Sequence, residues 1–274
     1  MDIKDNDKNN KVSIVLATYN RANMLEECID NLLQQTYQNI EIIIVNDCST
    51  DNTFKILEDY KNTDKISIIN HEKNQGLPTA LNNGFKKSSG DYLTWTSDDN
   101  LIHPKFCEKF VDTFNKNPTI DYLYCDYVVF KDKISDSKKV VKPLYTDKLD
   151  FLVNFSGASG FMWTRKVYER VGEFDVNLFG IEDWDYLLRI IFNDFKYLKI
   201  NKSLYYYRKH DESLTYNLIR TPRYEELHIN TCHKIVKLFP NFFSKCTYEL
   251  KNKIIAGRNK IIVKYLLNYY NIVI

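Results

Sequence analysis

Two adjacent acidic residues, Asp98 and Asp99, follow an apolar stretch that runs from Tyr92 to Thr96. Neighbouring carboxylates repel each other unless a cation lies between them, and oxygen ligands of this kind suit Mg²⁺ or Mn²⁺, which also bind phosphate oxygens. An isolated Asp-Asp-Asn sequence is more often a solvated turn. The polar clusters elsewhere in the chain therefore decide between a cation site and a turn.

The elements around this pair alternate between strands and helices. Apolar runs predict strands at Val12 to Thr18, Ile40 to Val45, Ile66 to Ile69 and Tyr92 to Thr96. Apolar residues at helical spacing predict a helix between each pair of strands: one capped by Asn23, one capped by the oxygens of Ser49 to Asp51, and one starting at Pro78. This order predicts an α/β fold with a Rossmann-like, mainly parallel central sheet flanked by helices.

Polar residues gather where these strands end. They are Thr18 to Asn20, Asp47, Asn74 to Leu77, and the pair Asp98 and Asp99. Ligands of parallel sheets bind beyond the carboxyl ends of the strands. The four clusters together therefore predict one ligand site at this edge of the sheet.

The second half of the chain has a different pattern. A helix from Phe106 to Asn115 and strands at Tyr122 to Phe130 and Phe161 to Thr164 are expected, with an exposed hairpin or loop at Lys131 to Lys142. Beyond Thr215, lysines alternate with large apolar residues, which indicates a helical extension.

A second acidic cluster, Glu182, Asp183 and Asp185, lies where a helix is expected to begin. Acidic residues in a first turn interact favourably with the helix dipole, by about 0.3–1 kcal/mol each. That stabilising role is the ordinary interpretation of Glu182 and Asp185.

Composition excludes several classes of protein. Lys and Arg number 38 against 36 Asp and Glu, so the near-neutral chain shows no charge signature of nucleic-acid binding. The six cysteines form no C-x-x-C pair and are expected to be reduced core thiols. The polar segment from Met1 to Lys11 resembles neither a signal peptide nor an anchor, and no apolar run approaches a membrane span. We expect a cytoplasmic protein, with a peripheral position at the inner face of the membrane as an open alternative.

Six segments in order resemble the family-two glycosyltransferases, inverting enzymes with the GT-A fold, of the SpsA-like kind. The segments are Val12 to Arg21, Val45 to Asp51, Asn74 to Leu77, Thr96 to Asn100, Gly180 to Asp185 and Tyr207 to His210. The resemblance covers about Lys11 to Thr215. It implies a nucleotide-sugar-binding half at 1–104, an acceptor-binding and catalytic half at 105–215, and a C-terminal helical extension at 216–274.

The resemblance implies a donor site for a nucleotide sugar, which we expect to be a UDP-sugar. Thr18 and Asp47 would bind the Watson–Crick edge of uracil, although Asp47 is also placed to cap the following helix. Tyr19 would stack on the base or pack nearby, Asn20 belongs to the same wall, and Arg21 would face phosphate or solvent. The loop of Asn74, Gly76 and Leu77 would pass beneath the nucleotide, because Gly76 lets the backbone come close. Asp98 would meet the ribose.

The resemblance also implies a divalent cation, Mn²⁺ or Mg²⁺, held by Asp99 with Asp98 and His210 as further candidates. Many relatives carry another acid two residues before the Asp-Asp pair, but this chain has Thr96 there. An imidazole beside carboxylates favours Mn²⁺.

By the same resemblance, Asp183 would be the general base for the acceptor hydroxyl, with Glu182 beside it. Trp184 would contact sugar or lie in the core, and the small residues Gly157 to Gly160 would flank the donor sugar. The acceptor would be a glycan, a lipid-linked intermediate or a protein.

Two other functions remain open at this point. A non-catalytic nucleotide-sugar-binding or interaction module on the same fold is the alternative that Thr96 supports. A nucleotidyltransferase is disfavoured, because the segment from Thr18 to Asn23 lacks the glycines of a phosphate-binding loop. The extension at 216–274 is expected to dock on the catalytic domain, to pair subunits or to lie on an anionic membrane.

Overall fold

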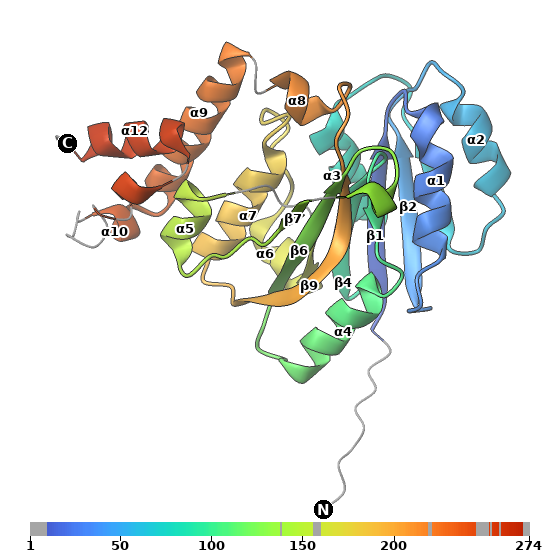
Figure 1. The fold of residues 1–274 in the computed structure, drawn as a ribbon, viewed down its shortest axis with the longest axis horizontal. Helices are drawn as coiled ribbons and strands as arrows, with labels where there is room; N and C mark the ends of the chain where they lie inside the picture. Colours follow the sequence, from blue (N-terminus) through green and yellow to red (C-terminus); the bar gives the residue numbers. More distant parts are fainter. Residues whose placement is uncertain are drawn as a thin grey trace, which may run out of the picture.

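A mixed β-sheet runs through the centre of the protein (Figure 1). The structure is a computed structural model that describes residues 10–137, 139–155, 160–218, 221–244, 252, 254–257 and 259–270. The strands are β1 (Val12–Thr18), β2 (Ile40–Asn46), β3 (Ile66–Asn70), β4 (Tyr92–Ser97), β5 (Leu101–Ile102), β6 (Tyr122–Phe130), β7 (Lys139–Val141), β8 (Phe161–Thr164) and β9 (Tyr197–Arg208). They follow the order β3-β2-β1-β4-β8-β6-β9-β5, and β7 pairs with β6.

The first four strands are parallel to their neighbours, as the apolar runs predict. The sheet then becomes mixed, because β8 lies antiparallel between β4 and β6, whereas β9 is parallel to β6. All seven residues of β1 are buried, as expected for a strand covered on both faces. The α/β prediction is confirmed, with antiparallel pairing concentrated in the second half.

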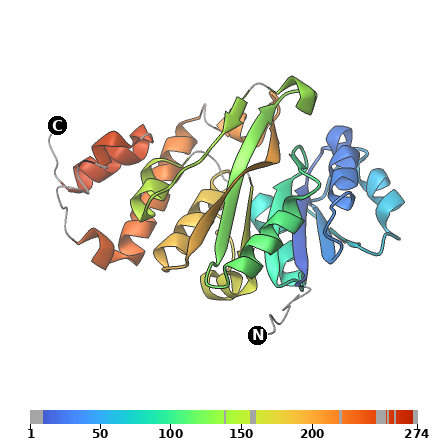
Figure 2. The same cartoon turned by 60° about the horizontal axis from the view of Figure 1, so that its bottom comes forward.

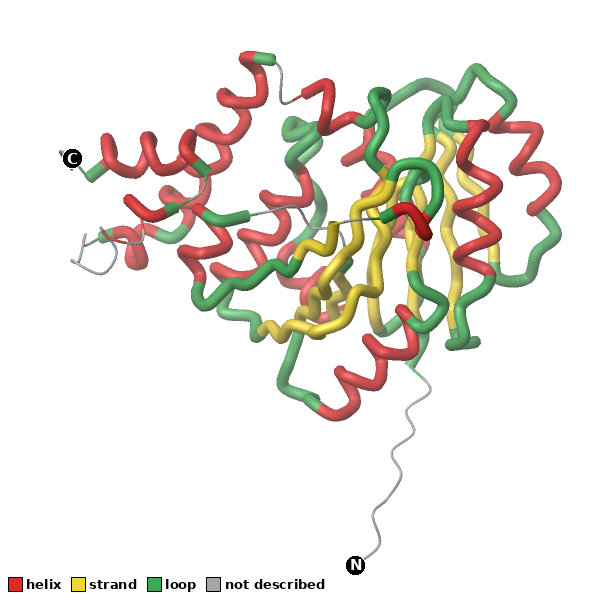
Figure 3. Tube along the Cα trace, viewed as in Figure 1, coloured by secondary structure: helices red, strands yellow, loops and turns green. Residues whose placement is uncertain are grey.

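Helices cover both faces of this sheet (Figures 2 and 3). The buried side chains of α1 (Ala22–Leu33), α2 (Thr53–Tyr60) and α4 (Phe106–Lys116) join one apolar core. Those of α3 (Leu77–Lys87), α5 (Lys148–Val153), α6 (Arg165–Val171) and α7 (Glu182–Phe192) join the core on the other face.

The described part of the extension docks on that second face. It contains α8 (Leu214–Leu218), α9 (Pro222–Leu238), α10 (Pro240–Phe243) and α12 (Lys260–Tyr269). Helix α9 packs on α7, and α12 packs on α9 and α5. Lys234 reaches from α9 to the carboxylates of Asp175 and Asp185, at 2.8 and 2.9 Å. The docking expected from the sequence is therefore present in the structure. No helix among the described residues is long and apolar enough to cross a membrane.

One local prediction needs correction, and a second holds for Asp51. Helix α1 begins at Ala22 with Arg21 as its N-cap, so the predicted cap Asn23 lies inside the helix. The oxygens of Asp51 accept hydrogen bonds from the amides of Ala22 and Thr53, both at 3.0 Å, so this side chain joins the starts of α1 and α2.

The remaining local features agree with expectation where they are described, except that Cys48 is only partly buried and so is not a core thiol. The stretch after β6 folds back as a hairpin, because β7 pairs with β6. Cys28, Cys107, Cys125 and Cys232 are buried free thiols.

Candidate functional site

The ends of β1, β2 and β4 lie at one edge of the sheet because these strands are parallel. Thr18 ends β1, and its carbonyl accepts a hydrogen bond from the amide of Asp47 at 2.9 Å. Asp98 and Asp99 follow β4 in a turn. The strand-end clusters predicted from the sequence are therefore neighbours in space.

Asp47 fastens the loop that leads into α3. Its Oδ1 accepts from the amide of Gln75 and faces His71 Nδ1, at 2.8 and 2.7 Å, and its Oδ2 accepts from the amide of Gly76 at 2.8 Å. Gly76 has φ = +84° and is the N-cap of α3, a conformation that glycine adopts without strain. The hydrogen bonds of Asp47 thus go to this loop, and Asp51 serves the start of α2 instead.

The three residues after Thr18 have different surroundings. Tyr19 is 46% exposed, which leaves its ring accessible to a base. Asn20 has φ = +53°, and its side-chain oxygen accepts from the amide of Thr50 at 2.7 Å, so it shapes the loop. Arg21 is largely buried and donates to the carbonyl and carboxylate of Glu212, at 2.7 and 3.1 Å.

Asp98 lies in a confined, negatively charged position. Burial, and then the charge of Asp99, raise the pKa of Asp98 to about 7, while Arg21, whose Nε lies 3.9 Å from Asp98 Oδ1, acts in the opposite direction. The backbone carbonyl of Asp98 accepts a hydrogen bond from the thiol of buried Cys28, with 3.0 Å between Sγ and the oxygen. Two carboxylates held together in this way favour an added positive charge.

Asp99 and His210 meet although they are far apart in the sequence. Asp99 Oδ2 lies 3.0 Å from His210 Nε2. Asp99 Oδ1 and His210 Nδ1 are both buried and have no hydrogen-bond partner within the described residues. Buried polar atoms are normally satisfied, so these two atoms are available to a cation or a water molecule, since no described residue bonds to them.

Thr96, where relatives have a further acid, is buried, and its hydroxyl hydrogen-bonds to that of Tyr205 at 3.0 Å. In the part of the chain that the structure describes, no group of three or more His, Cys, Asp and Glu side chains could hold a metal. A cation here would rely on Asp99 and His210, with other ligands from substrate or water. The unpartnered carboxylate oxygen and imidazole nitrogen fit that requirement.

Arg208 supports this corner and was not assigned a role from the sequence. Its Nε donates to the carbonyl of Asp99 at 2.9 Å, and its amide donates to Asn100 Oδ1 at 2.8 Å. The guanidinium pairs with Glu27 at 2.5 Å and lies over the ring of Phe130. The sequence feature that could have indicated this role is the position of Arg208 in the Tyr207 to His210 segment, two residues before the histidine.

Glu182 and Asp183 begin α7, next to Gly180, which has φ = +94°. Glu182 Oε2 accepts from the amide of Gly180 at 2.5 Å, and Asp183 Oδ1 accepts from the amide of Trp184 at 2.7 Å. Burial raises the pKa of both carboxyls, and the charge of Asp183 raises that of Glu182 further. Both carboxyls therefore hold a proton more readily than ordinary carboxyls do.

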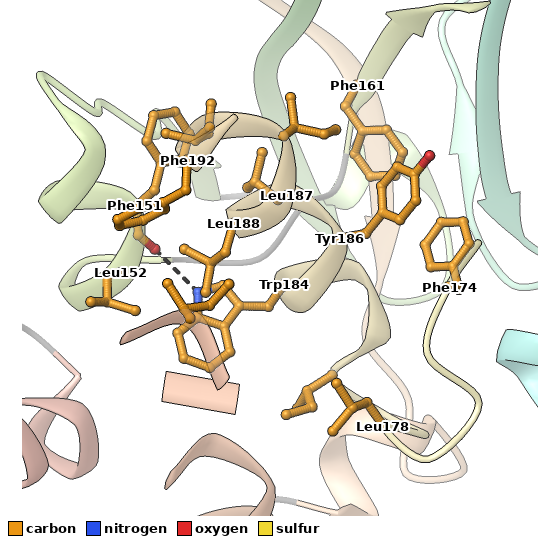
Figure 4. Close-up of a cluster of buried hydrophobic side chains, with 14 of the residues drawn as sticks. Phe151, Leu152, Phe161, Phe174, Leu178, Trp184, Tyr186, Leu187, Leu188 and Phe192 are labelled. Carbon is orange, nitrogen blue, oxygen red and sulfur yellow. Dashed lines mark hydrogen bonds between the residues drawn. The ribbon is translucent and has the colours of Figure 1, made fainter. Parts of the chain in front are cut away.

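The neighbours of this pair are structural. Asp185 is fully buried and pairs with Arg189 and Lys234, at 2.8 and 2.9 Å. Trp184 lies in the core, and its Nε1 donates to the carbonyl of Phe151 at 3.1 Å (Figure 4). Of the two roles considered for Trp184, the structure supports the core role.

Two observations relate Asp183 to the residues at the strand ends. Asp183 lines a small aromatic depression together with Trp95, which lies on β4 three residues before Asp98. On the other side, a Cβ added at Gly76 would lie 3.7 Å from the ring of Phe179, which precedes Gly180. The start of α7 therefore lies close to the loop that Asp47 binds.

The small-residue segment before β8 is only partly described. Residues 157–159 lie outside the described residues. A Cβ on Gly160 would lie 2.5 Å from Cys125 Sγ and 2.9 Å from Tyr205 Cβ, so this glycine is required by core packing.

The mixed sheet and its helical layers match solved glycosyltransferase structures of the GT-A fold. Residues 1–349 of Staphylococcus aureus TarS, in complex with UDP-GlcNAc, match with a TM-score of 0.71 and 17% identity, over 96% of this chain and 73% of that one. The mannosyltransferase PcManGT from Pyrobaculum calidifontis, in complex with GDP-Man and Mn²⁺, has a TM-score of 0.64 and 17% identity, over 94% of this chain and 73% of that one. At these identities the likeness establishes the fold.

The chain belongs to glycosyl transferase family 2, whose family model matches residues 13–172, more than half of the chain. An uncharacterized glycosyltransferase of Rickettsia typhi is 32% identical over 90% of this chain and 76% of its own length. Another, of Haemophilus influenzae, is 25% identical over 94% of this chain and 90% of its own length. The membership of family two predicted from the sequence is confirmed, and the SpsA-like detail stays a prediction.

Proposed function

We propose that this protein is a metal-dependent inverting glycosyltransferase that moves a sugar from a UDP-sugar to an acceptor hydroxyl, in the synthesis of cell-surface or protein glycans. The proposal rests on two acidic pairs in a family-two fold: Asp98 with Asp99 directly after β4, and Glu182 with Asp183 at the start of α7. Residues 1–104 would bind the donor and residues 105–215 the acceptor.

An unused lone pair on the carboxylate of Asp47 supports uracil as the base. A carboxylate has about four lone-pair positions. Three of them face His71 and the amides of Gln75 and Gly76, so Oδ2 keeps one position for a ring N–H. Thr18 and exposed Tyr19 lie at the neighbouring strand end and would complete the wall around the base.

Backbone groups would hold the rest of the donor. The loop of Asn74, Gly76 and Leu77 leads into the N-terminus of α3, where unpaired amides attract phosphate. Asp98 would bind the ribose. TarS, a structural neighbour, was solved with UDP and with UDP-GlcNAc, which supports a uridine donor here.

Asp99 and His210 would hold a divalent cation, Mn²⁺ in preference to Mg²⁺, with Asp98 close by. The cation supplies Lewis-acid stabilisation of the leaving diphosphate, which is worth several kcal/mol. The mannosyltransferase neighbour was solved with Mn²⁺. Arg208 would keep Asp99 in place through its carbonyl.

Asp183 would take the proton from the acceptor hydroxyl as that oxygen attacks the anomeric carbon from the face opposite the diphosphate. Such proton transfer contributes about 10²–10⁴-fold to a rate. Glu182 would keep its own proton, so that only one negative charge faces the acceptor. The acceptor would be a glycan, a lipid-linked intermediate or a protein.

A thermal-shift screen of UDP-, GDP- and dTDP-sugars, each with and without Mn²⁺, tests the donor and the metal together. We expect the largest rise in melting temperature with a UDP-sugar and Mn²⁺, because a ligand that binds only the folded state stabilises it. If the melting temperature rose with a GDP-sugar but not with a UDP-sugar, uridine would be rejected. If the rise were the same with and without Mn²⁺, the metal would be rejected.

A non-catalytic nucleotide-sugar-binding module is the second candidate, favoured by Thr96 in place of an acid. The two candidates differ in turnover. An enzyme should hydrolyse a UDP-sugar slowly without any acceptor, and Asp183→Asn should abolish that hydrolysis. Binding with no release of UDP over many hours would favour the module.

A further inference from the structure

Three polar side chains, those of Asn83, His71 and Asp47, form a largely buried hydrogen-bonded chain at the ends of β2 and β3. His71 follows β3 directly, and only 5% of its side chain is exposed. Its Nδ1 lies 2.7 Å from Asp47 Oδ1, and its Nε2 lies 2.9 Å from the side-chain nitrogen of Asn83 on α3. The backbone of His71 is also fixed, since its amide donates to the carbonyl of Asn46 at 2.9 Å.

The direction of these hydrogen bonds follows from the donor at Asn83. An amide NH₂ group only donates, so Nε2 of His71 accepts and Nδ1 carries the ring proton. Nδ1–H then donates to Asp47, alongside the amides of Gln75 and Gly76. Asp47 therefore faces three N–H donors and can offer a fourth partner only a lone pair.

We propose that His71, oriented by Asn83, is a positioning residue that sets the nucleobase specificity of the site. This inference rests on the proposed function, in which Asp47 meets the base. A carboxylate kept as an acceptor binds uracil, whose ring N3 carries a hydrogen. It repels cytosine, whose N3 presents a lone pair in the same place. The site should therefore prefer UDP to CDP.

Loss of the His71 donor should relax this preference. With one donor removed, the buried carboxyl of Asp47 can turn, and it then no longer presents a fixed lone pair to the base. A side chain that only filled space would affect both nucleotides alike. The ratio of the two affinities therefore separates positioning from packing.

Two amide substitutions provide a matched pair. In His71→Asn the side-chain NH₂ group lies near the place of Nδ1, so the donor to Asp47 is kept. In His71→Gln the amide group lies near the place of Nε2, so it faces Asn83 instead. Both variants are polar and neutral, and they differ mainly in which ring nitrogen they imitate.

The experiment is calorimetric titration of the full chain with UDP and with CDP, both with Mn²⁺, alongside thermal unfolding of each variant. The wild-type protein should bind UDP at least about tenfold more tightly than CDP, as expected for a hydrogen bond to a charged group. His71→Gln and His71→Leu should lower that ratio by about tenfold. His71→Asn should keep it within about threefold.

Several outcomes would overturn the inference. Equal weakening of UDP and CDP in all variants would show a packing role, and a ratio that is the same for the Asn and Gln variants would show that Nδ1 is not the group that matters. If these results accompany normal UDP binding by the wild-type protein, only this inference fails. If the wild-type protein binds neither nucleotide, the proposed donor fails with it.

Discussion

Replacing Asp183 by Asn should stop sugar transfer while the fold and donor binding persist. Asn keeps an oxygen that can accept from the amide of Trp184, now 2.7 Å from Asp183 Oδ1, so the start of α7 should survive. The free energy of unfolding should change by no more than about 1 kcal/mol, since that hydrogen bond is conserved. The amide cannot take a proton from the acceptor. We expect kcat to fall by about 10²–10⁴-fold, or about 3–5 kcal/mol of barrier.

Glu182→Gln is the matched control. Glu182 Oε2 accepts from the amide of Gly180, and a Gln oxygen can do the same. Because burial and the charge of Asp183 raise the pKa of Glu182, Gln resembles the protonated form that these two effects favour. We expect activity within about threefold of wild type. A loss as large as that of Asp183→Asn would move the base to Glu182.

The pH dependence follows from the same shifts. Both pKa values are raised by burial above the ordinary carboxyl values of about 4. The folded protein therefore binds protons that the unfolded chain has released, so this contribution to stability is complete at low pH and is lost as pH rises through the raised pKa values. Activity should show the opposite trend, because Asp183 works deprotonated. In the Glu182→Gln variant, stability should fall less steeply with rising pH.

The assay is UDP release with saturating donor, followed by chromatography, with donor affinity measured separately by calorimetry. The wild-type rate should rise with pH above the ordinary Asp range, and the donor Kd of Asp183→Asn should match that of wild type. Transfer by Asp183→Asn within tenfold of the wild-type rate would refute the assignment of the base.

Three further substitutions test the surrounding structure. Gly180→Ala should cost about 2–4 kcal/mol of stability in thermal unfolding, because φ is +94° and the added Cβ would lie 2.3 Å from Leu218 Cδ2. Adding Leu218→Ala to this variant should recover only the steric part of the loss, and full recovery would contradict the backbone argument. Lys234→Met should cost about 1–3 kcal/mol in denaturant unfolding, because it removes one of the two cationic partners of buried Asp185; an unchanged midpoint would show that the pair contributes nothing. Asp99→Ala should weaken UDP binding with Mn²⁺ by at least about tenfold, and calorimetry that finds the same affinity with and without Mn²⁺ in the wild-type protein would remove the cation from the proposal.

The strands that could be predicted are those whose side chains are almost all apolar. The expected bounds of Val12 to Thr18, Tyr122 to Phe130 and Phe161 to Thr164 match the structure. Strand β9 (Tyr197–Arg208) was not predicted, because lysines and tyrosines interrupt its apolar pattern. Its place beside β6 depends on pairing between distant segments, which local periodicity does not encode.

The candidate site shows the same division. Residues directly after strands, such as Asp47 and Asp98, could be placed at one edge from topology alone. Asp99 and His210 are 111 positions apart, and their proximity could be predicted only from the family resemblance. His71 also follows a strand directly, but a single histidine carries no mark of the partner it will meet. Its role became visible only when the folded chain brought it to Asp47.

The docked extension limits how this protein can be recombined with its relatives. Leu218 on α8 occupies the space beside Gly180, and Lys234 on α9 neutralises a carboxylate inside α7. The family match ends at residue 172, before all three helices, so a chimera joined there would keep α7 with α8 and α9, whereas a junction between α7 and α8 would separate them. A hybrid that exchanges acceptor preference should therefore inherit α7, α8 and α9 as one inseparable block from a single parent.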